Sequence, residues 1–134
     1  MPRFSRLVVF AMGLAFGLVL WLAPAFLFGV YEPWDGQNPA YVLALLGTGL
    51  ILGFLAPTQL FTAVAGVFTG QLLVLLGRVF ANPASSELWM VGVVFLAGYT
   101  FVATGIGAAL GGVLRRRLSP VPRGDDRRGR TTES

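Results

Sequence analysis

The sequence predicts an all-α integral membrane protein, a bundle of four transmembrane helices with both termini in the cytoplasm. Two observations predict this class. Apolar residues make up 55% of the 134 residues and charged residues only 12%, whereas about 25% is usual in soluble domains. The charged residues are also separated by long uncharged stretches. A water-soluble fold of this composition would lack the polar surface that it needs.

The uncharged stretches have the lengths of membrane spans. A helix rises about 1.5 Å per residue, so crossing about 30 Å of hydrocarbon takes about 20 residues. Residues 36–77 are enough for two spans, and Pro57 disfavours helix near their middle. We therefore expect one membrane domain over residues 1–118. Its four predicted spans are residues 7–30, 40–55, 59–77 and 88–114.

The arginines predict the orientation. Nine of the ten lie in the two terminal segments, whereas the two longer loops carry three acidic residues and only Arg78. Arginine-rich flanks stay in the cytoplasm, which predicts a multi-pass protein of the cell inner membrane with both termini inside. Ten arginines without a lysine suggest a prokaryotic source. Aromatic residues favour the membrane interface, and those expected at the outer boundary are Tyr31, Trp34, Tyr41 and Trp89.

The two ends of the chain have separate predictions. Arg3, Arg6 and the segment Ala23–Ala25 resemble a secretory signal with its cleavage site, but the apolar run continues to Val30, which favours a retained span. Residues 119–134 have almost no apolar side chains and are expected to form a disordered basic cytoplasmic tail.

The arginines that precede this tail could contact lipid. The attraction between anionic lipid headgroups and an arginine near the surface contributes about 1 kcal/mol. The alternative is that these arginines only fix the orientation of the last span. The chain has no folded element for reading nucleic acid, so we expect no nucleic-acid partner. The arginines concerned are Arg115, Arg116 and Arg117.

Glycines are predicted to pack the helices. Each predicted span contains a Gly-x-x-x-Gly pair, whose members lie about one helical turn apart on one face. The fourth span carries two such small faces and is expected to be the most buried, with Gly105→Leu disrupting the bundle. The predicted packing glycines are Gly13, Gly17, Gly49, Gly53, Gly66, Gly70, Gly98, Gly105, Gly107, Gly111 and Gly112.

A few uncharged polar residues fall within the spans. Gln71 is the most costly to bury, because its amide needs hydrogen-bond partners away from water. It is predicted to be an interhelical hydrogen-bond clip, and the alternative is a position lining a polar pathway. The predicted intramembrane polar cluster is Thr48, Gln71, Tyr99 and Thr104.

The tripeptide Asn-Pro-Ala occurs twice, at residues 38–40 and 82–84. The pair resembles the paired tripeptides of the aquaporins, whose pore-forming half-helices begin with them. Here both copies fall in expected outer loops, where Asn and Pro suit the first turn of a helix. Two copies before two spans also leave open a duplicated helical hairpin.

The composition limits the possible functions. Without cysteine or histidine the chain has no thiolate, disulfide, zinc or haem ligand, so we expect no enzyme, no cofactor and no metal site. No predicted span contains a charged residue, which disfavours proton-coupled transport. We expect a small non-catalytic subunit, stabiliser or modulator of a larger membrane assembly or homo-oligomer. The alternative is a small oligomeric transporter or channel with an uncharged polar pathway.

Overall fold

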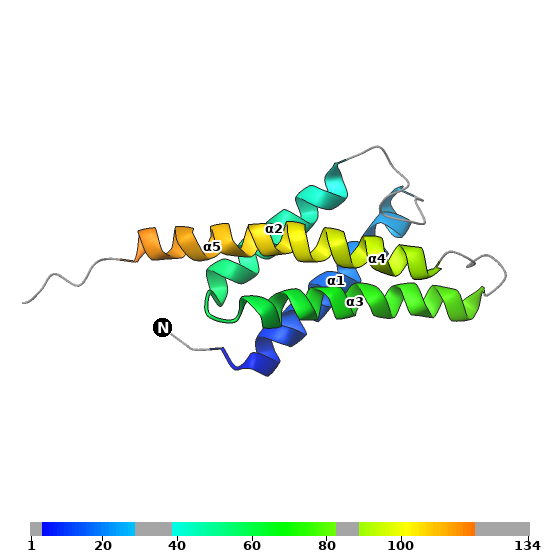
Figure 1. The fold of residues 1–134 in the computed structure, drawn as a ribbon, viewed down its shortest axis with the longest axis horizontal. Coiled ribbons are helices and arrows are strands. Elements are labelled where there is room, and N and C mark those ends of the chain that lie inside the picture. The colour runs from blue at the N-terminus through cyan, green and yellow to red at the C-terminus, as the bar shows by residue number, and fades with distance from the viewer. Residues whose placement is uncertain (1–3, 29–38, 83–88, 120–134) are drawn as a thin grey trace, which may run out of the picture.

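The computed structural model describes residues 4–28, 39–82 and 89–119, and over these ranges the chain is all-helical. Three single helices and one composite rod make up the fold (Figure 1). In chain order the single helices are α1 (Arg6–Phe28), α2 (Ala40–Leu55) and α3 (Leu60–Ala81). The fourth rod consists of α4 (Trp89–Tyr99), η2 (Thr100–Thr104) and α5 (Gly105–Leu118). Three of the four are long and apolar enough to span a membrane, and α2 is shorter.

The helix ends follow from local chemistry. Ser5 caps α1, because its Oγ accepts the backbone N–H of Val8 at 3.3 Å. Pro39 precedes α2, where its missing N–H costs no hydrogen bond. Pro57 limits the other end of α2, which stops at Leu55. A short turn then leads into α3, with the N–H of Gln59 donating to Ala56 at 3.0 Å.

Two helices extend past the spans expected from the sequence. α3 continues through Arg78 to Ala81, and the fourth rod continues through three arginines to Leu118. Arginine is a good helix former and is favourable near a helix C-terminus, so the first charge after an apolar run does not end the helix. The expected outer loop with Tyr31 and Trp34 and the expected tail beyond Ser119 lie outside the described residues.

The helices associate in two parallel pairs. α1 packs mainly against α3, and α2 packs mainly against α5. Gly13 faces Gly66 and Gly17 faces Gly70. Residue numbers therefore rise in the same direction along both helices of the pair. The same holds for α2 and the fourth rod, where Gly49 faces Thr104 of η2 and Gly53 faces Ala108 of α5.

The helix backbones touch at the glycines of both pairs. A Cβ atom placed on Gly13 would lie 2.5 Å from the carbonyl oxygen of Ala63. At seven other glycines the added atom would overlap a carbonyl oxygen of the facing helix, so no larger residue fits without moving the backbone. These seven are Gly17, Gly49, Gly53, Gly66, Gly70, Gly107 and Gly111.

The other predicted packing glycines of the fourth rod, Gly98, Gly105 and Gly112, make no such close contact. A Cβ on Gly98 or Gly105 would have no described atom within 4 Å, and one on Gly112 would make an ordinary 3.5 Å contact with Pro57. The rod has one closely packed side, towards α2, and its second glycine face is open. The sequence shows that Gly98 and Gly105 share a face, but not that this face lacks a neighbour.

The fourth rod changes its winding between α4 and α5. η2 is a π-helical turn, which inserts one extra residue into the helical ladder. Thr100, Ala103 and Thr104 in this turn are buried. The turn connects the buried side of α4, marked by Leu96, to the glycine face of α5.

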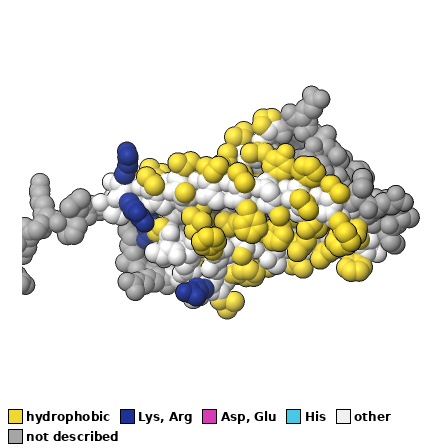
Figure 2. All heavy atoms as spheres, viewed as in Figure 1, with side chains coloured by type: hydrophobic (Ala, Val, Ile, Leu, Met, Phe, Trp, Pro, Cys, Tyr) yellow, Lys and Arg dark blue, Asp and Glu magenta, His cyan; other side chains and the backbone are white. Residues whose placement is uncertain are grey.

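Side chains on the outer surface divide by type. Figure 2 shows apolar side chains along the flank of the molecule and arginines at one end. Large apolar residues such as Phe61, Phe80 and Val94 are more than 70% exposed. In the described ranges every charged side chain is an arginine, and each lies near a helix end. They are Arg6, Arg78, Arg115, Arg116 and Arg117.

The contrast between closed and open glycines gives a test. We expect Gly17→Leu to destabilise the protein by about 3 kcal/mol or more, because α1 and α3 must separate to admit the side chain. Gly105→Leu should be neutral or slightly stabilising, because open space meets the new side chain and leucine is the better helix former. Thermal unfolding in mild detergent measures both. Equal losses of stability would contradict the two-pair packing.

Candidate functional site

The most distinctive interior site is a hydrogen-bonded cluster centred on Gln71 in α3. The Gln71 side chain is fully buried, at 0% exposure. Its Oε1 accepts hydrogen bonds from Trp21 Nε1 at 3.2 Å, from the Tyr41 hydroxyl at 2.5 Å and from Thr100 Oγ1 at 3.3 Å. One oxygen atom therefore joins α1, α2, α3 and η2.

The glycine contacts place the first donor. Val9, Gly13, Gly17 and Trp21 follow one another at every fourth position of α1, and all four are buried. Residues four apart lie on one helix face, so the indole sits one turn beyond Gly17 and faces α3. Gln71 directly follows Gly70, the glycine that Gly17 meets. The close approach of the backbones thus brings the indole N–H to the amide.

Tyr41 and Thr100 reach the cluster from the other helix pair. Tyr41 begins the buried face of α2, which continues with Leu45. Thr100 is the first residue of the π-helical turn. Since α2 and the fourth rod pack together, both hydroxyls arrive from the same side. The oxygen of Gln71 consequently links one helix pair to the other.

The indole donor fixes the orientation of the amide. An indole N–H can only donate a hydrogen bond, so Trp21 requires the oxygen of Gln71 and directs Nε2 elsewhere. Nε2 has two N–H donors, and it has no hydrogen-bond partner among the described residues. Thr104 Oγ1, one turn beyond Thr100, is also buried without a partner there. Each such group costs about 1–3 kcal/mol if it stays unpaired.

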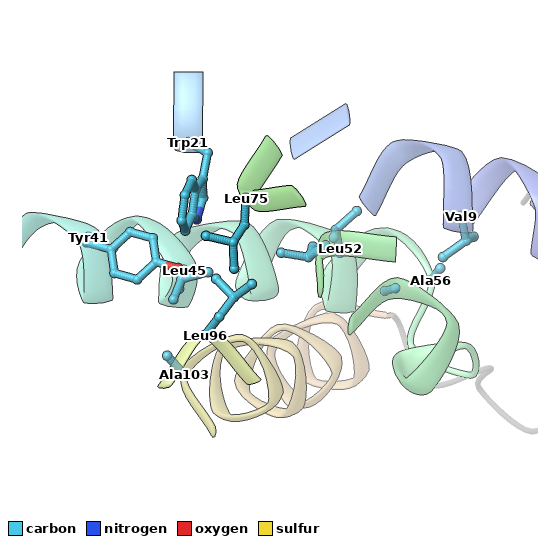
Figure 3. Close-up of a cluster of buried hydrophobic side chains, with 11 residues drawn as sticks. Val9, Trp21, Tyr41, Leu45, Leu52, Ala56, Leu75, Leu96 and Ala103 are labelled. Atoms are coloured by element: carbon cyan, nitrogen blue, oxygen red, sulfur yellow. The ribbon is translucent and has the colours of Figure 1, made fainter. Parts of the chain in front are cut away.

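Apolar side chains enclose the cluster. Figure 3 shows Trp21 and Tyr41 beside Leu45, Leu75 and Leu96, all of which belong to the buried core. This shell excludes bulk water and strengthens the hydrogen bonds inside it.

The structure brings together only part of the polar cluster expected from the sequence. Gln71 is the central clip, and Thr48 and Thr104 are buried but are not among its donors. Tyr99 is 41% exposed and contacts the cluster indirectly. Its ring packs edge-on against the ring of Tyr41, with centroids 6.4 Å apart.

Three cluster members were absent from the expected set: Trp21, Tyr41 and Thr100. Tyr41, expected among the aromatic residues of the outer boundary, packs within the bundle, because it is 9% exposed and donates to Gln71. A signal for Trp21 was present in its four-residue spacing from Gly17. A signal for Thr100 was its place on the face shared with Thr104 and Gly107.

Arg78 covers the outer side of the cluster. Its guanidinium carbon lies 5.4 Å from the centroid of the Trp21 ring, within the range of a cation–π interaction. Arg78 is also in the last turn of α3, where a positive charge complements the helix dipole. The indole is therefore held from two sides, by the amide of Gln71 and by this arginine.

The three arginines at the end of α5 differ in their surroundings. Arg115 Nη1 donates to the carbonyl oxygens of Phe54 at 3.1 Å and Leu55 at 2.7 Å. It therefore caps the C-terminus of α2, whose last carbonyls have no helical partner. Arg116 and Arg117 are exposed. Of the three expected lipid contacts, Arg115 thus has a structural role within the bundle.

A shallow apolar groove lies on the lateral surface between α2 and the fourth rod. Its volume is about 480 Å³. Val42 and Leu46 form one wall, and Val94, Gly98 and Val102 belong to the other. Of the open glycines described above, Gly98 lines this groove. Tyr99 also lines it, so Tyr99 and Tyr41 separate the groove from the buried amide.

The chemistry available at the cluster is limited to hydrogen bonding. Its members are an amide, an indole and two hydroxyls, all uncharged. In the described part of the chain there is also no group of three histidine, cysteine, aspartate or glutamate residues that could hold a metal ion. The arrangement is suited to holding helices in register or to binding a small hydrogen-bond acceptor.

Two tyrosines provide a matched test of the cluster. Tyr41→Phe removes a hydrogen bond to Gln71, and we expect it to lower stability by about 0.6–1.7 kcal/mol, the range for such bonds between membrane helices. Tyr99→Phe removes the same hydroxyl from a ring that only packs beside Tyr41, so its cost should be smaller. A double-mutant cycle with Gln71→Leu measures the coupling. Equal coupling for both tyrosines would contradict the assignment.

No family model matches the chain, and neither the curated proteins nor the solved structures include a similar one. The residues of the Gln71 cluster, the two glycine-packed pairs and the surface of the bundle are therefore the basis for assigning a function.

Proposed function

We propose that the chain is a small non-catalytic membrane protein that acts as a subunit, stabiliser or modulator of a larger membrane assembly or homo-oligomer. The observation that carries the proposal is the division between interior and surface. The buried oxygen of Gln71 is fully used by three donors within the chain. The flank offers an apolar groove lined in part by the open glycine Gly98.

The outer surface supports insertion into a bilayer. Its flank is apolar, and its arginines lie near helix ends (Figure 2). α2 has 16 residues and is therefore about 24 Å long, less than the ~30 Å hydrocarbon thickness. Arg115 caps the carbonyl oxygens at the C-terminus of α2, which would reduce the cost of placing that terminus near the hydrocarbon.

We propose that both termini are cytoplasmic. The start of α1 and the end of α5 lie at the same end of the bundle, with Arg6, Arg116 and Arg117 there. Only Arg78 among the described charges lies at the other end, and it stacks on Trp21. An excess of arginine marks the cytoplasmic side of short membrane-flanking segments.

The glycine pairs favour association through the other face of the fourth rod. Gly-x-x-x-Gly faces commonly join helices of separate chains, but here all four pairs are closed by helices of the same chain. Gly98 and Gly105 on the fourth rod are open, and Gly98 lines the lateral groove. A helix of another subunit could approach closely at that face.

A second candidate is a small oligomeric transporter or channel. It is favoured by Nε2 of Gln71 and Oγ1 of Thr104, two buried donors without a partner in the described part of the chain that a passing polar solute could use. The pathway would be lined by Thr48, Gln71, Tyr99 and Thr104. Proton coupling is disfavoured, because the buried polar residues of the described chain are uncharged.

The assembly is tested by purification in mild detergent followed by mass analysis. We expect the 14.3 kDa chain to elute with another membrane subunit or as a defined homo-oligomer. Gly98→Phe should release the partner while leaving the bundle folded, because that glycine is open. Gly77→Phe is the matched control, since Gly77 is equally open but lies on α3, away from the groove.

Two outcomes would count against the assembly. A strictly monomeric wild-type chain would remove the subunit proposal. A homo-oligomer that conducts a solute into liposomes, and loses that flux in Gln71→Leu while staying folded, would establish the second candidate instead.

The orientation is tested with reporter fusions in a bacterial host. Alkaline phosphatase is active only outside the cytoplasm, so we expect activity when it is fused after Asp35 and none when it is fused after Gly124. The reverse pattern would invert the proposed topology. A fusion after Thr58, in the short α2–α3 turn, should also be inactive and provides an internal check.

A further inference from the structure

We infer that the end of the bundle carrying Arg6, Arg116 and Arg117, here called the basic end, binds the phosphate headgroups of anionic phospholipids. The inference rests on the proposed insertion into a bilayer, which would place this end at the membrane surface. It names the class of lipid that these side chains bind, whereas the subunit proposal says nothing about lipid binding.

Three separate parts of the chain are tied together at the basic end. The side-chain amide of Gln59, in the α2–α3 turn, donates to the carbonyl oxygen of Phe4 at 2.8 Å. Arg115 donates to the end of α2 at 2.7 Å. The start of α1, the α2–α3 turn and the end of α5 are therefore tied together at one end of the bundle (Figure 1).

The charged side chains that the structure describes on this surface are all arginines. α1 and α3 both begin here, and neither has an acidic residue in its first turn, where helices favour one. Arg6 occupies the first turn of α1 instead. Within residues 4–28, 39–82 and 89–119 there is no aspartate or glutamate to neutralise these charges. Anionic headgroups are the counter-charge that a bilayer surface would supply to these arginines.

The last turn of α5 separates a structural arginine from two available ones. Arg115 points to α2 and is engaged with Phe54 and Leu55. Arg116 and Arg117 follow at about 100° steps around the helix, and both are exposed. Guanidinium groups bind phosphate oxygens in a bidentate manner. Leu118 beside them is 66% exposed and is suited to contact with the adjoining acyl chains.

The test measures which lipid the full chain retains from mixed detergent micelles that contain equal amounts of phosphatidylglycerol and phosphatidylcholine. We expect the wild type to retain phosphatidylglycerol in excess. Arg116→Gln with Arg117→Gln should lower that excess by about fivefold for each arginine removed. Arg116→Lys with Arg117→Lys keeps the charge but loses the bidentate geometry, so it should keep only part of the excess. Added salt should weaken the preference.

Two matched variants separate binding from folding. Arg78→Gln removes one charge from the opposite end and should leave the lipid preference unchanged, although it loses its contact with Trp21. Arg115→Gln should lower the thermal stability even in phosphatidylcholine alone, because it removes the cap of α2. The double glutamine variant should keep wild-type stability there.

Three results would overturn the inference. They are an unchanged lipid preference in the double glutamine variant, an equal loss in Arg78→Gln, and equal competition by soluble glycerol phosphate, which would make the site one for free phosphate. Failure of the membrane proposal would look different. In that case the chain would be released from membranes by alkaline extraction, whatever lipid its arginines prefer.

Discussion

The rest of the structure depends on the close approach of two pairs of helix backbones. At the facing glycines the direction that a side chain would take points at a carbonyl oxygen of the opposite helix. This geometry permits weak Cα–H···O contacts and extensive van der Waals packing. In a bilayer, where apolar side chains gain little by leaving lipid for protein, such contacts are a principal means of holding helices together. Each pair is therefore stabilised by contacts that are possible only because the glycines have no side chain.

The polar cluster uses this packing and also limits it. Trp21 follows Gly17 by one turn, and Gln71 follows Gly70 directly, so the indole meets the amide only when the two glycine faces are aligned. Sliding one helix by a turn would move donor and acceptor about 5.4 Å apart. Tyr41 and Thr100 extend the same requirement to the second pair. Glycines allow close contact at several alignments, and the hydrogen bonds favour one.

The sequence was sufficient for the helices and for much of the packing, since hydrophobic length and Gly-x-x-x-Gly spacing are local properties. The bounds of α2 match the expected span, and Gln71 accepts hydrogen bonds from other helices, although not from the residues expected. Gly98 and Gly105 could not be distinguished from Gly107 and Gly111, because periodicity groups residues on a face without naming the neighbour of that face. The partners of Gln71 were missed for the same reason. They come from three other elements, and one of them lies in a π-helical turn that an ideal helical repeat does not describe.

The parallel pairing has a consequence for how the protein is made. The main partner of α1 is α3, and that of α2 is α5, so neither helix of the first half finds its partner until the second half has been synthesised. Pairing of segments distant in sequence is slow and leaves contact faces uncovered meanwhile. The glycine faces of α1 and α2 would then be exposed to other nascent helices in the interval. Completion of α5 becomes the step that commits the chain to its own bundle, and interruption of synthesis before Gly107 would leave α2 without its partner.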